Sequence, residues 1–212
     1  MIEVDEQVNA VRRTVGRRTL EAGEARTVTI SRSYAADKAD VWDAVTNAER
    51  IPRWFLPVTG DLRLGGHYQL EGNAGGTIES CDPPNGFTAT WEYGGEVSWI
   101  EVRLTEEGPD RTPLVLEHIA HVDDERWTQF GPGAVGVGWD LGLLGLTLHL
   151  ASGEPVDPAA FMAWSETDEG HRFMTVSARG WGEAAIADGD DPDTARATAE
   201  RTAGFYTGAE EG

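Results

Sequence analysis

The fold is decided by one stretch, residues 31–57, which reads SRSYAADKADVWDAVTNAERIPRWFLP. It begins inside an alternating segment, Arg26–Tyr34, whose period of two predicts a β-strand. Asp37 then stands where the N-cap of a helix is expected. The apolar residues that follow at helical spacing are Val41, Trp42, Val45 and Ala48. Because Asn47 and Pro52 divide this pattern, the stretch predicts a strand followed by two short helices.

The stretch ends in an apolar cluster that lies between two prolines. The cluster consists of Ile51, Trp54, Phe55 and Leu56. So short a run cannot anchor a protein in a membrane, and no nucleophile, base or metal ligand stands within it. The cluster is therefore expected to cover another part of the protein.

Five segments after Gly65-Gly66 have the pattern of successive antiparallel strands. They are HYQLEG, GTIESCD, GFTATWEYG, EVSWIEVRLTEEG and TPLVLEHIAHV. Each is bounded by Gly, Pro, Asn or Asp, the residues that hairpin turns require. A weaker alternation in VGRRTLEAG, before residue 26, could form the first arm of a hairpin. Together these segments predict a meander of roughly six strands, which needs a covering helix.

The covering helix is predicted in residues 133–150, GAVGVGWDLGLLGLTLHL. Its two apolar stripes run through Val135, Trp139, Leu143, Leu146 and Leu150, and through Leu141, Leu144 and Leu148. The run is short for a bilayer and is interrupted by Asp140 and His149, so the pattern favours a helix buried on two sides over a membrane span. Glycines in the run would let another backbone approach closely or leave room beside the helix. They are Gly138, Gly142 and Gly145.

The remaining residues predict three further helices. A short one starts at Asp157-Pro158, a longer one runs from Thr167 or Asp168 to Ala187, and a last one runs from Asp191-Pro192 to Gly208. The apolar residues that they could bury are Phe161, Trp164, Phe173, Val176, Trp181, Phe205 and Tyr206. The chain is therefore divided into a domain of residues 1–154, with its core in residues 25–150, and a helical extension of residues 155–212 that packs on this domain or on a partner subunit.

The composition is strongly acidic. Asp and Glu number 37 against 17 Lys and Arg in 212 residues, which gives a formal net charge of −20. The negative electrostatic potential of so acidic a protein repels phosphate backbones and anionic lipid surfaces. Neither nucleic-acid binding nor membrane insertion is therefore expected. The pairs Arg12-Arg13 and Arg17-Arg18 are the local exception, and they are interpreted as solvated strand or loop positions.

The N-terminal segment indicates where in the cell the protein is expected, and the number of cysteines limits its disulfide and metal chemistry. The N-terminal segment lacks the apolar core of a secretory signal, and its early acidic residues argue against a transit peptide. We therefore expect a cytoplasmic protein. Cys81 is the single cysteine of the sequence, so it forms no intramolecular disulfide and builds no zinc site by itself.

No catalytic residue, metal site or cofactor is predicted. His118 and His121 lie on one predicted strand at positions that face opposite sides, so they cannot chelate one ion. The strand carboxylates show no pairing for acid–base work, and the chain has no G-x-S-x-G elbow, P-loop or dinucleotide fingerprint. His118 shares a face with Leu114 and Leu116. A satisfied buried histidine is the simpler interpretation, with a ligand contact or a general base as the alternative.

The order of these pieces resembles the START-like (SRPBCC) superfamily, in the branch named after the activator of the heat-shock protein 90 ATPase. The resemblance rests on residues 31–57 together with GDLRLGGHYQL, GTIESCDPP, TWEY, TPLVLEH and GWDLGLLGL. It implies an α+β helix-grip (START-like, Bet v-like) fold, in which a curved antiparallel sheet surrounds a long helix and leaves an elongated cavity. The candidate lining residues are Trp54, Phe55, Tyr68, Trp91, His118, Trp139 and Leu143. Residues 54–56 would then close the cavity mouth or pack beneath the long helix.

Three functions fit this resemblance. The first is binding of a hydrophobic small molecule, since burying about ten methylenes at about 0.8 kcal/mol each gives about 8 kcal/mol, enough for micromolar affinity before entropy costs. The second is an interaction module that stimulates a chaperone ATPase, although a second co-chaperone domain is not recognisable. The third is an enzyme of the cyclase or aromatase kind, with His118 as its leading candidate. The sequence leaves these alternatives open, together with the choice between monomer and homodimer.

Overall fold

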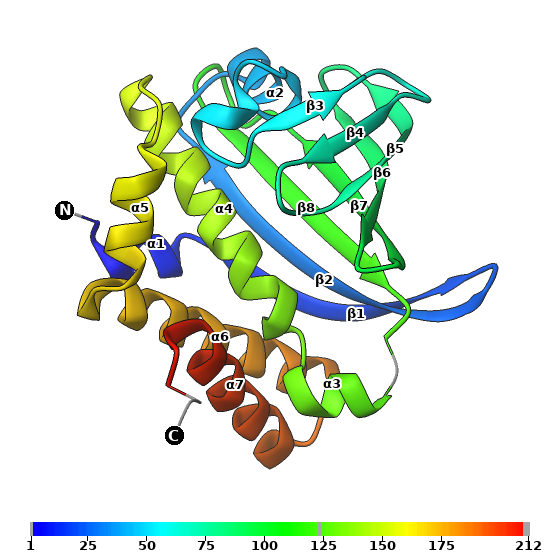
Figure 1. Ribbon diagram of the computed structural model, residues 1–212, viewed down its shortest axis with the longest axis vertical. Coiled ribbons are helices and arrows are strands. Elements are labelled where there is room, and N and C mark those ends of the chain that lie inside the picture. Colours follow the sequence, from blue (N-terminus) through cyan, green and yellow to red (C-terminus); the bar gives the residue numbers. More distant parts are fainter. Residues whose placement is uncertain (1, 123, 210–212) are drawn as a thin grey trace. The chain divides into compact units, whose positions relative to one another are not determined.

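The computed structural model describes residues 2–122 and 124–209 (Figure 1). Its contacts form two compact units. The first comprises the segments up to Ile30, His121–Leu141 and from Asp157 onward, and the second comprises Ser31–Ala120 and Gly142–Val156. Neither unit is a continuous stretch of chain. The strand β2 (Gly23–Tyr34) and the helix α4 (Gly133–Ser152) each continue from one unit into the other.

Eight strands form one antiparallel sheet in the order β1-β2-β8-β7-β6-β5-β4-β3 (Figure 1). Besides β2, they are β1 (Arg12–Leu20), β3 (Val58–Gly60), β4 (His67–Leu70), β5 (Gly75–Asp82), β6 (Gly86–Tyr93), β7 (Glu96–Leu104) and β8 (Thr112–Ala120). The curved sheet and the long helix α4 confirm the predicted α+β helix-grip fold. The strand β3 was not predicted, because three residues are too few to show an alternating pattern.

The strand register brings polar and apolar side chains onto one buried face. Ala89 pairs with Ile100, and Ile100 pairs with His118, so the three lie in a row across β6, β7 and β8. Two residues after Ala89 on β6, Trp91 pairs with Ser98 of β7. Because side chains alternate between the two faces of a strand, Trp91, Ser98 and His118 project from the same face.

The short helices of the second unit begin and end where the sequence predicts. Asp37 caps α2 (Lys38–Thr46), since its Oδ1 accepts a hydrogen bond from the backbone N–H of Asp40 at 2.8 Å. Asn47 ends this helix with an extended backbone conformation. Pro52 lies in the single-turn 3-10 helix η1 (Ile51–Arg53) that follows.

The apolar cluster after η1 packs against the C-terminal half of α4. The rings of Trp54 and Phe55 stack with their centroids 5.4 Å apart, and Trp54 Nε1 donates to the carbonyl of Ala44 at 2.8 Å. A methyl group added at Gly145 would lie 2.3 Å from the carbonyl oxygen of Trp54, and one at Gly142 would lie 3.5 Å from the Phe55 ring. The prediction that a helix glycine permits a close backbone approach is therefore confirmed at Gly145.

The first unit contains the remaining helices. They are α1 (Val4–Asn9), α3 (Asp124–Phe130), α5 (Pro158–Ser165), α6 (Asp168–Asp188) and α7 (Pro192–Thr207). The last three begin at the predicted N-caps Asp157, Thr167 and Asp191, whose side chains accept hydrogen bonds from the first turn. Gly208 ends α7 in the left-handed conformation, with φ of 68°. The helices α6 and α7 lie side by side (Figure 1).

Two aromatic side chains from α6 and α7 contact the N-terminal half of α4. The indole of Trp181 lies so close to Gly136 that an added methyl group would be 2.2 Å from its Cε2. The Tyr206 hydroxyl donates to a backbone carbonyl in the first turn of α4 at 2.9 Å. Val135 is 40 % exposed and Phe205 is 66 % exposed. The predicted burial of these two side chains is wrong, because their neighbours Gly136 and Tyr206 make the contacts.

A buried ion pair joins β1, α4 and α6 inside the first unit. Asp140 is 1 % exposed and accepts hydrogen bonds from Arg13 Nη2 at 2.6 Å, from Arg13 Nε at 3.1 Å and from Trp181 Nε1 at 2.8 Å. The Arg13 side chain is 7 % exposed, so its interpretation as a solvated position is wrong. A buried carboxylate needs a cation and hydrogen-bond donors, and Arg13 supplies both.

The other ionisable residue in the apolar run of α4 is also partnered. His149 Nδ1 lies 2.8 Å from the carbonyl oxygen of Glu154, which can only accept, so Nδ1 carries the hydrogen. The guanidinium of Arg50 can only donate, and its Nη2 lies 3.3 Å from His149 Nε2. Arg50 also pairs with Asp40 and Asp43 at 2.6 and 3.1 Å. His149 therefore links the end of α4 to the short helices of the second unit.

The helix α4 is, within the described residues, the one helix long and apolar enough to cross a membrane, with a mean hydropathy of 1.4. Half of that apolar window is buried inside the protein. The helix is long enough to cross a bilayer, so the expectation that the run is too short for one is wrong. The helix is buried on two sides, since Trp181 covers its N-terminal half and Trp54 covers its C-terminal half.

Candidate functional site

A polar cluster lies on the buried sheet face of the second unit. Its centre is His118, which is 6 % exposed. The Nε2 atom of His118 lies 2.9 Å from the Ser98 hydroxyl oxygen, which itself lies 2.9 Å from the carbonyl oxygen of Trp91. The indole of Trp91 meets the imidazole of His118 edge-on, with the ring centroids 6.2 Å apart. His118 therefore lies beside Trp91, on the sheet face that it shares with Leu116.

The hydrogen positions in this cluster follow from the partners. The Trp91 carbonyl can only accept, so it takes the single hydroxyl hydrogen of Ser98, and Ser98 Oγ then accepts from the Nε2–H of His118. Burial lowers the pKa of His118 to about 4, because the charged imidazolium would lose its hydration. At neutral pH His118 is thus an uncharged donor. Such a weak base is poorly matched to proton abstraction near pH 7.

Acidification is expected to destabilise the protein through His118. This side chain titrates near its ordinary value of 6.5 when unfolded and near 4 when folded. As pH falls below 6.5 the unfolded state binds the proton first, so the free energy of unfolding decreases between pH 6.5 and 4. At about pH 4.5 the loss from this residue is about 2–3 kcal/mol relative to neutral pH. Urea unfolding at the two pH values measures it.

The control for this experiment is His118→Gln, which keeps a donor for Ser98 but does not titrate. All other titrating groups contribute equally to the pH dependence of the original protein and of His118→Gln. The difference between the two pH dependences is therefore the contribution of His118. Equal pH dependences for the original protein and His118→Gln would show that burial does not lower this pKa.

Tyr68 places another polar group beside β6. Its side chain is buried on β4, and its hydroxyl donates to the carbonyl of Thr90 at 2.7 Å. Burial, and secondly the Glu92 carboxylate, raise the pKa of Tyr68 well above its ordinary value. The hydroxyl therefore stays protonated and acts as a donor.

The other predicted lining residues make packing contacts. Trp54 and Phe55 lie against α4, which is one of the two roles left open for their cluster. Leu143 is buried in α4, and its carbonyl accepts from the Tyr34 hydroxyl at 3.4 Å. Trp139 is buried and belongs to the first unit. The assignment of these residues to a ligand cavity stays a prediction.

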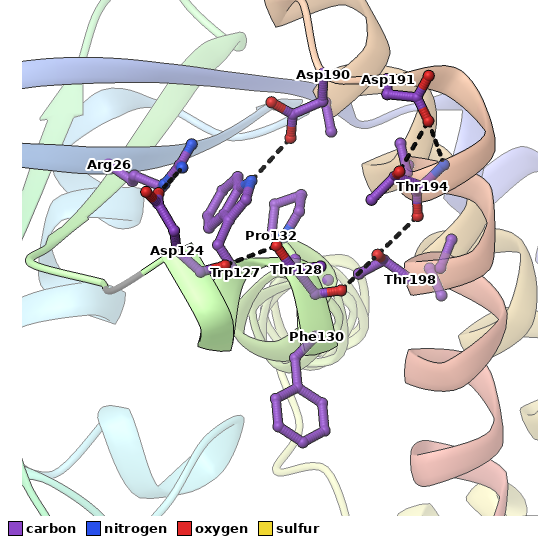
Figure 2. A pocket seen from close by; sticks show the side chains of 17 residues that line it. Arg26, Asp124, Trp127, Thr128, Phe130, Pro132, Asp190, Asp191, Thr194 and Thr198 are labelled. Carbon is purple, nitrogen blue, oxygen red and sulfur yellow. Dashed lines mark hydrogen bonds and ion pairs between the residues drawn. The ribbon is translucent and has the colours of Figure 1, made fainter.

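A hollow of about 200 Å³ lies among α3, α6 and α7 in the first unit (Figure 2). Trp127 forms an aromatic wall, and its indole nitrogen donates to Asp190 Oδ2 at 2.8 Å. Arg26 stacks on the Trp127 ring at 4.4 Å and pairs with Asp124 at 2.9 Å. The other walls are mostly small side chains, contributed by Gly131, Gly133, Ala178, Gly182, Ala185, Ala195 and Ala199.

The potential metal ligands do not gather in one place. Within residues 2–122 and 124–209, no group of three or more His, Cys, Asp or Glu side chains is arranged to hold a metal ion. His121 lies on the surface, with Nδ1 2.9 Å from the carbonyl oxygen of Glu24. Cys81 is exposed as a free thiol.

Sequence reasoning missed two features that carry a recognisable signal. Asp140 and His149 interrupt an apolar helix, and a polar residue within such a helix signals a buried partner elsewhere in the chain. The second feature is the hollow, which two aspartates of the turn GDDPD (189–193), Asp190 and Asp191, help to line. A concentration of aspartates beside a predicted helix start identifies the segment, but nothing local identifies Trp127 as its neighbour.

Comparison with protein families gives a match over the central part of the chain. The family described as "Activator of Hsp90 ATPase homolog 1-like protein" matches residues 35–150, which is more than half of the chain. A search of curated proteins gave no match.

Solved structures share the fold. CalU16 from Micromonospora echinospora is 36 % identical, and the comparisons cover 84 % of this chain. They cover 99 % of the CalU16 chain in its crystal structure and 97 % in its solution NMR structure, with TM-scores of 0.67 and 0.70. An HSP90 activator from Plasmodium falciparum is 20 % identical, with a TM-score of 0.51 over 61 % of this chain and 97 % of that chain. This second likeness concerns the fold alone.

Proposed function

The chain belongs to the Activator of Hsp90 ATPase homolog 1-like family, and from this premise we propose that it binds a hydrophobic small molecule that carries one polar group. The ligand would lie on the buried sheet face of the second unit. Its polar group would approach His118, Ser98 and Tyr68, and its apolar part would contact Trp91. We place this activity in the cytoplasm, with no cofactor.

The cluster of His118, Ser98 and Trp91 is the observation that supports this proposal most directly. The same face also carries buried aliphatic side chains, such as Ile100 and Leu116. Burying an imidazole and a hydroxyl costs free energy unless each is hydrogen-bonded, so a face needed for packing alone would favour aliphatic side chains. A few fixed polar groups on an apolar surface are the usual means of orienting a ligand.

Native mass spectrometry of the protein purified without detergent tests the proposal. A co-purified apolar compound that is lost on denaturation would support it and would identify the ligand class. A protein that carries no such mass, and that also fails to respond to added apolar ligands in the titration below, would refute it.

Trp91 is expected to report ligand binding, whereas Trp99 is not. Trp99 pairs with Thr90 and Ile119, and it follows Ser98 directly, so it projects from the opposite face of the sheet. Titration with a long-chain fatty alcohol should change the tryptophan fluorescence of the original protein and of Trp99→Phe. The change should be mostly lost in Trp91→Phe. Equal changes in the two variants would place the ligand elsewhere.

The family description favours a second candidate, the stimulation of a chaperone ATPase. The test is the rate of ATP hydrolysis by heat-shock protein 90 with and without this protein, alongside a co-chaperone of known effect. A faster rate would support the interaction module. An unchanged rate would remove this candidate and leave the ligand-binding proposal intact.

A further inference from the structure

We propose that the polar group of the ligand on the buried sheet face is a neutral hydrogen-bond donor, so that the ligand is an apolar alcohol or phenol and not a fatty acid, an inference that rests on the ligand-binding function proposed above. Three polar side chains of this face have already donated their hydrogens to other groups of the protein. What they can still offer to a ligand is a lone pair.

Four strands bring these polar groups together on the buried sheet face. Tyr68 of β4 pairs with Gly76 of β5, and the register between β5 and β6 places Gly76 opposite Trp91. Trp91 in turn pairs with Ser98 of β7. Because residues paired across strands project from the same face, the side chains of Tyr68 and Ser98 lie on either side of Trp91.

Both hydroxyl groups donate their single hydrogen to the backbone of β6. The Tyr68 hydroxyl donates to the carbonyl of Thr90 at 2.7 Å, and the Ser98 hydroxyl donates to the carbonyl of Trp91 at 2.9 Å. A methyl group at Gly76 would collide with the Thr90 carbonyl, so the absence of a side chain there lets the Tyr68 hydroxyl reach it. Each hydroxyl oxygen can therefore accept a further hydrogen bond but cannot donate one.

His118 adds no spare hydrogen to this group. Its Nε2–H donates to Ser98 Oγ at 2.9 Å, and burial lowers the pKa of the imidazole to about 4, so the second ring nitrogen carries no hydrogen at neutral pH. A ligand group that can only accept finds no donor among Tyr68, Ser98 and His118. A hydroxyl, in contrast, can donate to the oxygen of Tyr68 or of Ser98.

The charges near these side chains also disfavour an anion. The Glu92 carboxylate adds to the effect of burial in raising the pKa of the Tyr68 hydroxyl, so a negative charge already acts on this position. The net charge of −20 repels anions from the protein as a whole. The indole N–H of Trp91 could serve either class of ligand, but one donor does not satisfy a buried carboxylate, which accepts about four hydrogen bonds.

Isothermal titration calorimetry at neutral pH with three ligands of similar size tests the proposal. The ligands are nonan-1-ol, its isomer octyl methyl ether, which accepts but cannot donate, and the anion nonanoate. Nonan-1-ol should bind about tenfold more tightly than the ether, because the ether cannot form the hydrogen bond to Tyr68 or Ser98. Nonanoate should bind at least about 100-fold more weakly than nonan-1-ol, since its charge would be buried without a partner.

The results distinguish this inference from the function on which it rests. If the ether or nonanoate binds as tightly as nonan-1-ol, the ligand class is wrong and the proposed ligand site is retained. If none of the three compounds binds, the ligand class and the proposed function are both refuted.

Ser98→Ala tests where the donor binds. The variant removes one acceptor and leaves the Nε2–H of His118 without its partner, so the ether oxygen can accept this hydrogen. The preference for nonan-1-ol over the ether should fall to about twofold or less. Ser80→Ala is the matched control, because it removes an exposed hydroxyl of β5 that bonds to Thr88, and it should keep the preference of about tenfold. Equal preferences in the two variants would refute the role of Ser98. If Ser98→Ala does not fold, the comparison of the three ligands in the original protein still decides.

Discussion

Asp140→Ala is expected to lower the free energy of unfolding by about 3–5 kcal/mol. The Arg13 side chain would stay buried without its counter-ion, because it is only 7 % exposed. The indole of Trp181 would lose its acceptor at the same time. Urea unfolding followed by far-ultraviolet circular dichroism measures the change.

Two further variants separate the stranded charge from the lost hydrogen bonds. Asp61→Ala breaks a bidentate but exposed pair with Arg63 and should leave stability nearly unchanged. Replacing both partners, as Arg13→Met with Asp140→Leu, should recover much of the stability that Asp140→Ala loses, because no unpaired charge remains buried. A double variant as unstable as Asp140→Ala would show that the stranded cation is not the main cost.

Gly145→Ala is expected to destabilise the protein by about 3 kcal/mol, although alanine is the better helix former. The added methyl group would lie 2.3 Å from the carbonyl oxygen of Trp54, a backbone atom that cannot rotate away. The indole of Trp54 is itself held by its hydrogen bond to Ala44. The whole segment after η1 would therefore have to move.

Gly142→Ala is the matched control on the same helix. Its methyl group would lie 3.5 Å from the Phe55 ring, an ordinary van der Waals distance. The gain in helix propensity of about 1 kcal/mol then has nothing to oppose it. Thermal unfolding should show opposite shifts for the two variants. A loss of stability at both positions would mean that glycine is required for another reason.

The helix starts were predictable wherever one side chain decides them. Asp37, Thr167 and Asp191 each cap the helix that the sequence predicts after them, because an N-cap is a local interaction within about three residues. The face of His118 was predictable for a similar reason, since alternation along one strand fixes it. These features need no knowledge of the rest of the chain.

The partners of buried polar groups were not predictable, because they lie far apart in the sequence. Arg13 stands 127 residues from Asp140, and neither has a local pattern that points to the other. Ser98 reaches His118 only through the register between β7 and β8. The hollow is harder still, because small residues leave space only when the elements that carry them have packed.

The discontinuous make-up of the first unit constrains the order of events during protein synthesis. Arg13 leaves the ribosome early, but its partners Asp140 and Trp181 follow only after most of the chain has been made. At about 5–20 residues per second, Trp181 follows Arg13 by on the order of 10–30 s. The second unit is complete at Val156 and can form sooner. A nascent chain stalled before α6 would expose the apolar N-terminal half of α4, a surface that chaperones and proteases recognise.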